Sequence, residues 1–550
     1  LKVGLLMGSY WIPAWQYLMA EKIIHCGFAA IEFIVVKDGK KASFPKFDPF
    51  LKKPQYFLYR WYSKLDELLF RQNPDAFEIK DARNILTGIP EINFVPESPV
   101  PGNSTGDTLL EKIKRIPLDV LIDLGFGDLD REILKLPRFG VWSYHHGDDW
   151  TSEEGPVGFW EVFEDNPVTG SMLKMASGES GDEIPIYRSY SYTDWLSVIR
   201  NNNKLFFKSA SFVPRKLKEY HVFGEEAFLK DKEKKDLEFN DKPFRGWPTN
   251  GQMLIHLFKL LKKFLRKKIP LLFCMEQWQL MFRFGKGISR SFHQFKPLAP
   301  PPEKFWADPH ILFKDGQYYI VFEELDYETN KGYISVIPID AKGNGPPPTK
   351  IIEEPHHLSY PFPFEWKGEY YIVPESSQNQ SIDVYKCVEF PYQWEFHKRI
   401  FNNITAADNT LAFLNGKWWL FTNVCENPGC DTSEELFLFF ADDPLSTEWQ
   451  AHPLNPIVSD SRRARPAGRI LEYGGSIYRP AQNTGGPWGL GISLNKIIKL
   501  SETEYQEIEV GVYKPFWDKR RLRIHTLAYD RGLTVIDALT LRPKFPFWNK

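Results

Sequence analysis

The chain has 550 residues, more than one hydrophobic core usually organises, so two or three domains are expected. A formal net charge of −2 gives no electrostatic case for a nucleic-acid partner. Five cysteines are too few for a disulfide scaffold, and no apolar run is long enough for a membrane-spanning helix. With no secretory signal in view, a cytoplasmic location is expected. Aromatic residues make up 15% of the chain, which favours β-rich structure and flat rings that suit a sugar.

The first 150 residues alternate between predicted strands and helices. Apolar runs at Val3–Met7, Ile31–Val36 and Val120–Leu124 predict buried strands, and Ile12–Ile24 has the spacing of a helix. A β-α-β start of this kind is typical of a doubly wound parallel sheet, so the front part is expected to be an α/β domain.

Ligands of such sheets bind beyond the carboxyl ends of the strands. Here those ends are Gly8-Ser9, Gly125–Asp128 and His145–Asp149. The first turn has no G-x-G-x-x-G sequence, which disfavours a dinucleotide site. The His145–Asp149 segment, with its two His and two Asp, has three interpretations: a solvated loop, a metal site, or a histidine that works in group transfer.

The segment Asp119–Gly170 resembles the catalytic half of the formyltransferase family, which includes methionyl-tRNA and sugar N-formyltransferases, and the resemblance covers residues 1–210. It rests on the order of four stretches: Asp119–Gly127, Gly140–His145, Gly155–Trp160 and Val168–Leu173. The resemblance implies transfer of a formyl group from 10-formyltetrahydrofolate to an amine. The candidate catalytic residues it implies are His145, Glu179 and Ser143, and Gly125 and Asp128 would bind substrate. Ser143 and Glu179 stand where the family has Asn and Asp.

A linker with a basic amphipathic helix is predicted between residues 216 and 302. Leu254–Arg266 alternates large apolar residues with lysines, and Pro270 is expected to end the helix. Two interpretations stay open: the helix packs its apolar face on a neighbouring domain, or it lies on an anionic membrane surface.

The back half contains an internal repeat. Triplets centred on residues 308, 360, 408 and 466 each precede a glycine by eight positions, at 316, 368, 416 and 474. A fainter fifth copy joins His525 to Gly532. Each copy reads as a strand, a Gly-containing hairpin and a second strand, and repeats of this kind with a period near 50 predict a five-bladed propeller.

The first strand of each blade lines the axis of a propeller, so the triplets should meet there. The residues expected to converge are Asp308, Tyr360, Asp408, Arg465 or Pro466, and His525. They form either a functional pocket or a set of axial groups that hydrogen-bond one another and trapped water.

The opening Phe305–Pro309 resembles the propeller of family 43 glycoside hydrolases. Residues 303–541 resemble more closely the N-terminal propeller domain of plant glucosamine inositolphosphorylceramide transferases, through stretches such as Leu358–Phe362, Asp408–Leu411 and Tyr478–Gln482. Glycosidases need two carboxylates. The resemblance implies Asp308 as base, Glu375 or Glu324 as acid, and Asp408 as a group that sets a pKa or binds substrate. Arg479 joins Tyr360, Arg465 and His525 as a predicted substrate contact. Arg465–Gly468 stands where the hydrolases carry their acidic Glu.

The sequence therefore predicts a formyltransferase-like doubly wound α/β domain (1–215), a linker (216–302) and an all-β five-bladed propeller (303–545). The expected function is group transfer to an amino sugar, as a sugar nucleotide or lipid-linked sugar, in surface-glycan biosynthesis. One alternative is a glycoside hydrolase or glycosyl-transfer enzyme with its site in the propeller. The other is a glycan-binding protein without activity, held at the inner face of a membrane. No metal is expected.

Overall fold

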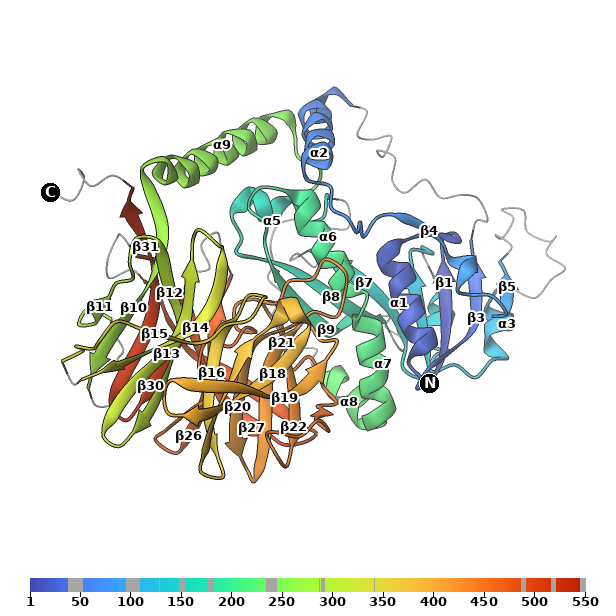
Figure 1. The fold of residues 1–550 in the computed structure, drawn as a ribbon. Coiled ribbons are helices and arrows are strands. Elements are labelled where there is room, and N and C mark those ends of the chain that lie inside the picture. The colour runs from blue at the N-terminus through green and yellow to red at the C-terminus, as the bar shows by residue number, and fades with distance from the viewer. Residues whose placement is uncertain are drawn as a thin grey trace, which may run out of the picture. The chain divides into compact units, whose positions relative to one another are not determined.

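The computed structural model describes residues 1–37, 53–94, 109–127, 129–147, 155–176, 178, 183–233, 245–285, 287, 292–340, 342–485, 491–515 and 521–544. The chain divides into two compact units (Figure 1). The first, the front unit, comprises Leu1–Ser189, Thr193–Phe258 and Asn427–Cys430. The second, the propeller unit, comprises Tyr190–Tyr192, Lys259–Glu426 and Asp431–Lys550.

A seven-stranded sheet organises the front unit, in the order β5-β3-β1-β6-β7-β8-β9. The strands are β1 (Lys2–Met7), β3 (Ala30–Val36), β5 (Glu91–Asn93), β6 (Val120–Leu124), β7 (Val141–His146), β8 (Val168–Ala176) and β9 (Glu183–Tyr192). The five strands from β5 to β7 are parallel, and β8 runs antiparallel to β7. The predicted strands are present, and the sheet is mixed rather than wholly parallel.

Helices cover both faces of this sheet because successive strand residues point to opposite sides. Leu5 belongs to a core with Met19 of α1 and Phe212 of α7, whereas Leu6 belongs to a second core with Ile113 of α3. The helices are α1 (Ala14–His25), α2 (Phe57–Phe70), α3 (Leu109–Lys114), α4 (Arg131–Leu134), α5 (Phe159–Glu164), α6 (Val198–Ser209), α7 (Phe212–Phe223) and α8 (Glu225–Lys232). A small ribbon of β2 (Trp11–Pro13) and β4 (Ile79–Asp81) completes the unit.

The predicted basic helix is α9 (Asn250–Phe273), and it is longer than its sequence pattern indicated. It continues through Pro270 to Phe273 instead of ending at the proline, and β10 (Cys274–Phe284) follows at once. No helix among the described residues is long and apolar enough to cross a membrane.

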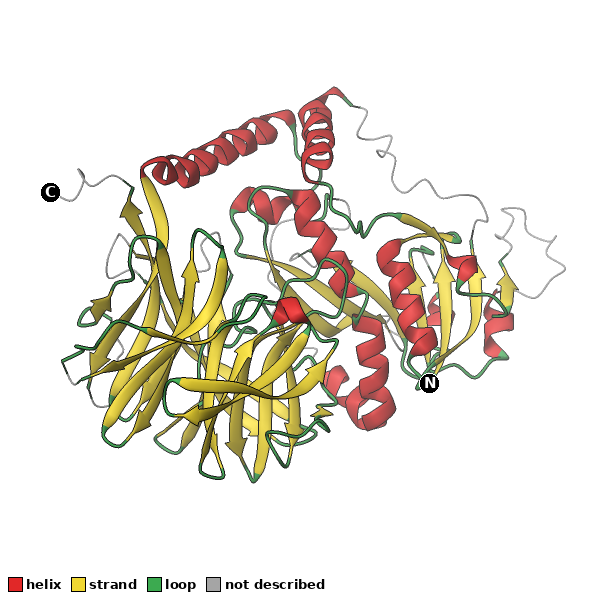
Figure 2. Cartoon of the chain, viewed as in Figure 1, coloured by secondary structure: helices red, strands yellow, loops and turns green. Residues whose placement is uncertain are grey.

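Five antiparallel sheets in the described part of the propeller unit form its blades (Figure 2). Blade 1 holds β12 (Lys304–Lys314), β13 (Gln317–Asp326), β14 (Lys331–Ile339) and β15 (Thr349–Ile352). Blade 2 holds β16 (Ser359–Trp366), β17 (Glu369–Glu375), β18 (Ser381–Glu389) and β19 (Gln393–Asn402). Blade 3 holds β20 (Ala406–Leu414), β21 (Lys417–Val424), β22 (Glu435–Ala441), β23 (Gln450–Ala451) and β24 (Val458–Ser459). Blade 4 holds β25 (Leu471–Tyr473), β26 (Ser476–Asn483), β27 (Gly491–Leu500) and β28 (Tyr505–Tyr513).

Blade 5 combines strands from both ends of the propeller sequence. It joins β29 (Arg521–Arg523), β30 (Leu527–Asp530) and β31 (Leu533–Pro543) to β10 and β11 (Lys296–Leu298). β10 pairs with β31 along its full length, from Cys274 opposite Pro543 to Phe284 opposite Leu533. The propeller therefore includes β10 and β11, which lie in the part of the chain that the sequence pattern placed in the linker. This pairing closes the ring of blades.

The repeated glycines are explained by the hairpin turns. Each first hairpin turns on two residues with positive φ: Asp315-Gly316, Lys367-Gly368, Asn415-Gly416, Gly474-Gly475 and Arg531-Gly532. Two-residue turns of this kind match the twist of the strands and favour glycine. In blade 4 the second turn residue is Gly475, one position beyond the glycine that the repeat pointed to.

Cys425 and Cys430 form a disulfide, while the other three cysteines are free. Disulfides are rare in a reducing cytoplasm. This pair therefore gives no support to the expected cytoplasmic location.

Candidate active site at the propeller axis

The middle residues of the first three triplets all lie in β-bulges. Asp308, Tyr360 and Asp408 have φ values of 51°, 42° and 54°, and the strand register shifts at each of them. Bulges re-aim side chains, and left-handed backbone at non-glycine residues is strained by about 1–3 kcal/mol. The same strained conformation recurs at the equivalent position of three blades, which indicates that it serves a purpose at the axis.

A second set of polar residues follows each hairpin on the second strand of the blade. Glu323, Glu375 and Asn423 lie opposite Ala307, Ser359 and Ala407, the residues just before the bulges. Gln482 in blade 4 occupies the corresponding place, because its N–H donates to the carbonyl of Arg465. Asp537 supplies the polar group from β31 in blade 5. We call these five residues the second-strand set.

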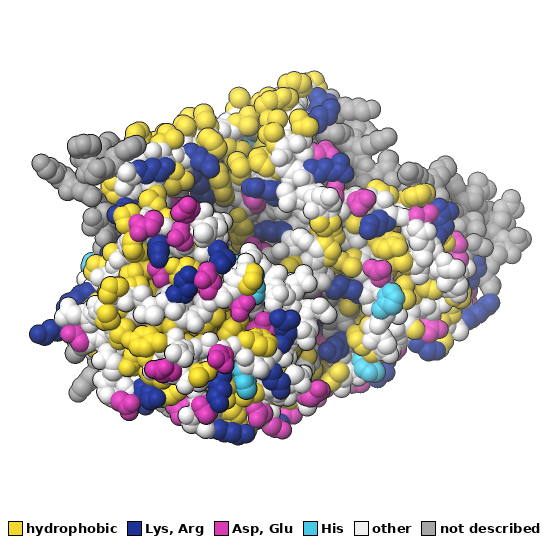
Figure 3. Space-filling model, viewed as in Figure 1, with side chains coloured by type: hydrophobic (Ala, Val, Ile, Leu, Met, Phe, Trp, Pro, Cys, Tyr) yellow, Lys and Arg dark blue, Asp and Glu magenta, His cyan; other side chains and the backbone are white. Residues whose placement is uncertain are grey.

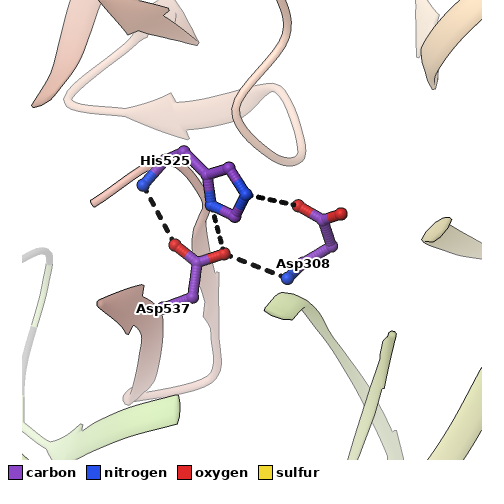
Figure 4. A group of neighbouring side chains, drawn as sticks. All are labelled: Asp308, His525 and Asp537. Carbon is purple, nitrogen blue, oxygen red and sulfur yellow. Dashed lines mark hydrogen bonds and ion pairs between the residues drawn. The ribbon is translucent and has the colours of Figure 1, made fainter. Parts of the chain in front are cut away.

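Asp308, His525 and Asp537 form one group at the axis (Figure 4). The Nδ1 atom of His525 lies 2.5 Å from Oδ2 of Asp537, and its Nε2 lies 3.6 Å from Oδ1 of Asp308. Asp537 also accepts hydrogen bonds from the backbone N–H groups of Asp308, His525 and Thr526. The imidazole is further fixed by stacking on Trp278, with ring centroids 4.0 Å apart. Asp537 thus orients His525, whose other nitrogen faces Asp308.

The charges in this group shift the pKa values of His525 and Asp308. Burial alone would lower the pKa of His525, but the carboxylates of Asp537 and Asp308 raise it to about 9. Burial raises the pKa of Asp308, and the charge on His525 opposes that rise. The Thr526 hydroxyl donates to Oδ1 of Asp308 at 2.8 Å, while the described residues donate no hydrogen bond to its Oδ2. Asp308 therefore has one carboxylate oxygen available to a ligand.

Across the axis, Arg465 joins two carboxylates. Its Nε donates to Oδ2 of Asp408 at 2.6 Å, and its Nη2 lies 3.4 Å from Oε2 of Glu375. Gln482 also donates to Oδ2 of Asp408, and the backbone N–H of Asp408 donates to Glu375. Burial raises the pKa of Asp408 to about 7 despite the opposing charge of Arg465. Both oxygens of Asp408 accept hydrogen bonds, so this residue holds the Arg465 guanidinium in place and is not a reacting group.

Glu323 is a buried carboxyl that the sequence did not single out. Its Oε1 lies 3.1 Å from Nε2 of His357, whose Nδ1 accepts the backbone N–H of Gly332. Burial, opposed by the hydrogen bond to His357 and assisted by the charge of Asp308, raises the pKa of Glu323 to about 7. Glu323 is thus a carboxyl that can hold a proton near neutral pH, close enough to Asp308 for the charge of Asp308 to raise its pKa.

Two further residues complete the axis. The Tyr360 hydroxyl accepts the backbone N–H of Gly468 and shares a hydrogen bond with Thr410, so it ties blade 2 to its neighbours. Asn423 is fully buried, and neither of its amide atoms has a hydrogen-bond partner among the described residues. Buried amides are normally hydrogen-bonded, so Asn423 has capacity for a bound group.

The donor atoms of Asp308, His525 and Asp537 also lie within 4.8 Å of one another, close enough to hold a metal ion. However, Asp537 already accepts three backbone N–H groups and pairs with His525. Both carboxylate oxygens of Asp537 are therefore already engaged within the protein.

Two of the predicted propeller residues lie outside this cluster. Glu324 follows Glu323 and points to the other face of blade 1, where it pairs with Lys304 at 3.0 Å and accepts from Ser335. Arg479 is 1% exposed and pairs with Glu507 of the same blade at 2.7 Å. Both side chains therefore have partners within their own blade. No described interaction joins either of them to the residues at the axis, where the sequence placed them.

The front-unit candidates lie at the carboxyl end of the parallel strands. Ser143 and His145, two residues apart on β7, share one face, and Ser143 is flanked in register by Asp123 and Lys174. Gly125 directly follows β6, and its carbonyl would lie 3.0 Å from a Cβ added at Gly8, which directly follows β1. Glu179, Asp128, Asp148 and Asp149 lie outside the described residues.

His146 lies on the opposite face of β7 from His145. It stacks on Phe206 with ring centroids 3.8 Å apart, and burial lowers its pKa to about 3. His146 is therefore a neutral, half-buried side chain within an aromatic cluster, which argues against a role as a proton carrier near neutral pH.

Comparison with known proteins finds similarity to part of the propeller sequence. The family model described as glucosamine inositolphosphorylceramide transferase 1, N-terminal, matches residues 297–526. The rice protein (Oryza sativa subsp. japonica) named glucosamine inositolphosphorylceramide transferase 1 is 31% identical over 214 residues, covering 38% of this chain and 28% of that protein. The Arabidopsis thaliana protein of the same name is 34% identical over 212 residues, with the same coverage. The chain therefore spans less than a third of the length of these relatives.

Among solved structures, a family 117 glycoside hydrolase from Zobellia galactanivorans is 14% identical with a TM-score of 0.32, covering 50% of this chain and 94% of that one. A GH62 α-L-arabinofuranosidase domain from Coprinopsis cinerea is 12% identical with a TM-score of 0.34, covering 48% and 97%. The five-bladed architecture rests on the strand pairing described above. The family match confirms the resemblance expected for the back half, and the resemblance of residues 1–210 to formyltransferases stays a prediction.

Proposed function

We propose that the propeller axis is a carbohydrate site at which a glycosidic bond is broken or transferred. The observation that carries this proposal is the pair of buried carboxyls Asp308 and Glu323, held in different environments at the bulge of blade 1. Glycosyl chemistry needs one carboxylate and one carboxylic acid. The relatives named above are called glucosamine inositolphosphorylceramide transferases, a name that supports a sugar, and an amino sugar in particular, as the substrate class.

In this proposal Asp308 acts as the base or nucleophile. The protonated His525 near its Oδ1 favours the ionised form, and the hydrogen bond from Thr526 holds the carboxylate in place. Glu323 acts as the general acid, because its pKa of about 7 keeps it protonated in mildly acidic solution. Glu375 and Arg465 form the opposite wall and contact sugar hydroxyls, while the buried Asp408 holds Arg465 in place.

The role of Glu323 is tested by comparing leaving groups. A nitrophenolate departs without a proton, whereas an alkyl alcohol needs one. Glu323→Gln is therefore expected to lower kcat/KM about 10²–10⁴-fold on alkyl glycosides of glucosamine and N-acetylglucosamine, and far less on their nitrophenyl glycosides. On the alkyl substrates, activity of the wild type should fall as pH rises through about 7, because Glu323 loses its proton there.

The decrease in activity above pH about 7 should be absent from the alkyl-glycoside activity that Glu323→Gln retains, because glutamine has no proton to lose there. Equal losses on both leaving groups would contradict an acid role. If the wild type binds oligosaccharides but does not turn them over, the propeller is a glycan-binding domain without enzymatic activity.

A second candidate function belongs to the front unit and is supported by the polar row Asp123, Ser143 and Lys174 beside His145. We propose formyl transfer to an amino sugar there, as the resemblance to formyltransferases implies. Ser143 and His145 are two of the three catalytic residues that the resemblance implies, and the third, Glu179, lies outside the described residues. The described residues thus do not complete a site for 10-formyltetrahydrofolate, and we derive no step through it.

This second candidate predicts saturable binding of the stable analogue 5-formyltetrahydrofolate in calorimetric titration. His145→Ala should weaken that binding about tenfold, the effect of a lost interaction of 1–2 kcal/mol. His221→Ala, on the exposed part of α7, is the matched control and should leave it unchanged. Absence of binding in the wild type would contradict a folate site.

A further inference from the structure

The helix α9 exposes an apolar stripe along its whole length. Six large residues follow one another at spacings of three or four positions, which places them on one side of a helix. They are Leu254, Phe258, Leu261, Leu265, Ile269 and Leu272, and their exposed fractions run from 43% to 68%. Only Met253 and His256 of this helix are buried. The stripe is therefore not the packing face of α9, and Figure 3 shows hydrophobic side chains gathered along it.

The charge of α9 has a single sign. Its 24 residues include no Asp or Glu, and the cationic residues are Lys259, Lys262, Lys263, Arg266, Lys267 and Lys268. On a helix with 3.6 residues per turn, most of these cations lie beside the stripe on one flank rather than within it. A helix with an apolar stripe and a purely basic flank complements a surface that offers hydrocarbon under anionic groups.

The first residues of α9, which belong to the front unit, pack against a second helix. Asn250, at the start of α9, accepts the backbone N–H of Leu58 at 3.0 Å and donates to the carbonyl of Pro54, so α2 is fixed against it. Tyr62 and His256 pack edge to face between the two helices. α2 itself exposes Phe57 and Trp61. Tryptophan favours the interfacial region of a bilayer, where its ring is apolar and its N–H stays hydrated.

From these observations we propose that α9, assisted by α2, is a peripheral anchor that lies in the plane of an anionic lipid bilayer. Its leucine and phenylalanine side chains enter the acyl boundary, while lysine and arginine reach the headgroups. The helix is too charged to cross the bilayer, which agrees with an in-plane position. A neighbouring protein helix would usually match basic side chains with acidic ones. The uniform positive charge favours lipid, and it also disfavours a second copy of the same helix. This anchor is independent of the function proposed for the axial site.

The test is co-sedimentation of the full-length chain with phosphatidylcholine vesicles, with and without 30% phosphatidylserine. Binding is expected to the anionic vesicles only, and to weaken as salt rises from about 0.05 to 0.5 M, because headgroup attraction is screened. Leu261→Asp with Leu265→Asp should lower the partition coefficient at least tenfold. Lys262→Gln with Arg266→Gln should lower it about tenfold on anionic vesicles.

The matched control places Asp on exposed apolar residues of the propeller, Phe396 and Val510, and should leave vesicle binding unchanged. Equal losses in the control and in the α9 variants would overturn the proposal. So would wild-type protein that fails to sediment with either vesicle. Light scattering decides whether a second copy covers the stripe instead: a dimer that Leu265→Asp converts to a monomer, without vesicle binding, would assign the stripe to self-association.

Discussion

Replacing Asp308 by Asn is expected to lower kcat on every glycoside substrate about 10²–10⁴-fold, whatever the leaving group. The amide keeps an oxygen that can accept the hydrogen bond from Thr526, so the bulge and the fold should persist. What the variant loses is the negative charge beside His525. Turnover of nitrophenyl and alkyl glycosides, together with the thermal unfolding midpoint, measures the two consequences separately.

The matched control is Asp383→Asn, the same change at a buried carboxylate in blade 2. Asp383 pairs with Arg399 through two hydrogen bonds and is 2% exposed, so its loss should lower stability. Its kcat should stay near that of the wild type. If Asp308→Asn retains wild-type turnover, Asp308 is a structural residue of the bulge and the proposed chemistry is wrong.

Removing the guanidinium of Arg479 is expected to cost about 3–5 kcal/mol of unfolding free energy, the largest stability effect that we anticipate. Arg479 and Glu507 are almost completely buried, and Arg479→Met leaves the Glu507 carboxylate without its cation. The free energy of unfolding in urea measures this cost.

The double variant Arg479→Met with Glu507→Leu should recover more than half of the lost stability, because it removes the uncompensated charge. Tyr505 then loses its acceptor on Glu507, so full recovery is not expected. The affinity of any sugar ligand should be unaffected in the double variant. Weaker ligand binding there would restore Arg479 to the substrate contacts, as the sequence predicted.

The repeat in the sequence was sufficient to predict the blades and most of the axial residues. Strand and turn positions follow from the Gly spacing, because the two-residue turns need a residue that tolerates positive φ. The same glycines also predict the positions of the second-strand set in four blades. Glu323, Glu375, Asn423 and Gln482 each lie seven positions after the second turn residue of their hairpin.

The choice between Glu323 and Glu324 shows why strand register matters. A shift of one residue sends a side chain to the opposite face of a sheet, and the sequence offers two adjacent glutamates. Only the pairing of Glu323 with Ala307, the residue before the bulge, settles which one faces Asp308.

Asp537 and β10 could not be predicted from the repeat, for a different reason. Blade 5 is assembled from strands more than 200 residues apart in sequence, so it lacks the local order of the other blades. Asp537 lies five positions after Gly532 rather than seven, and nothing local relates it to Asp308. Its role emerges from the closed ring, where it accepts the backbone N–H of Asp308.

The most direct test of the axial site is a mass-spectrometric screen for products from alkyl and oligosaccharide glycosides of glucosamine and N-acetylglucosamine. The wild type, Asp308→Asn and Asp383→Asn should be compared on the same mixture. We expect cleaved or transferred sugar with the wild type and with Asp383→Asn, and essentially none with Asp308→Asn. Equal product from all three proteins, or none from the wild type, would contradict glycosyl chemistry at the propeller axis.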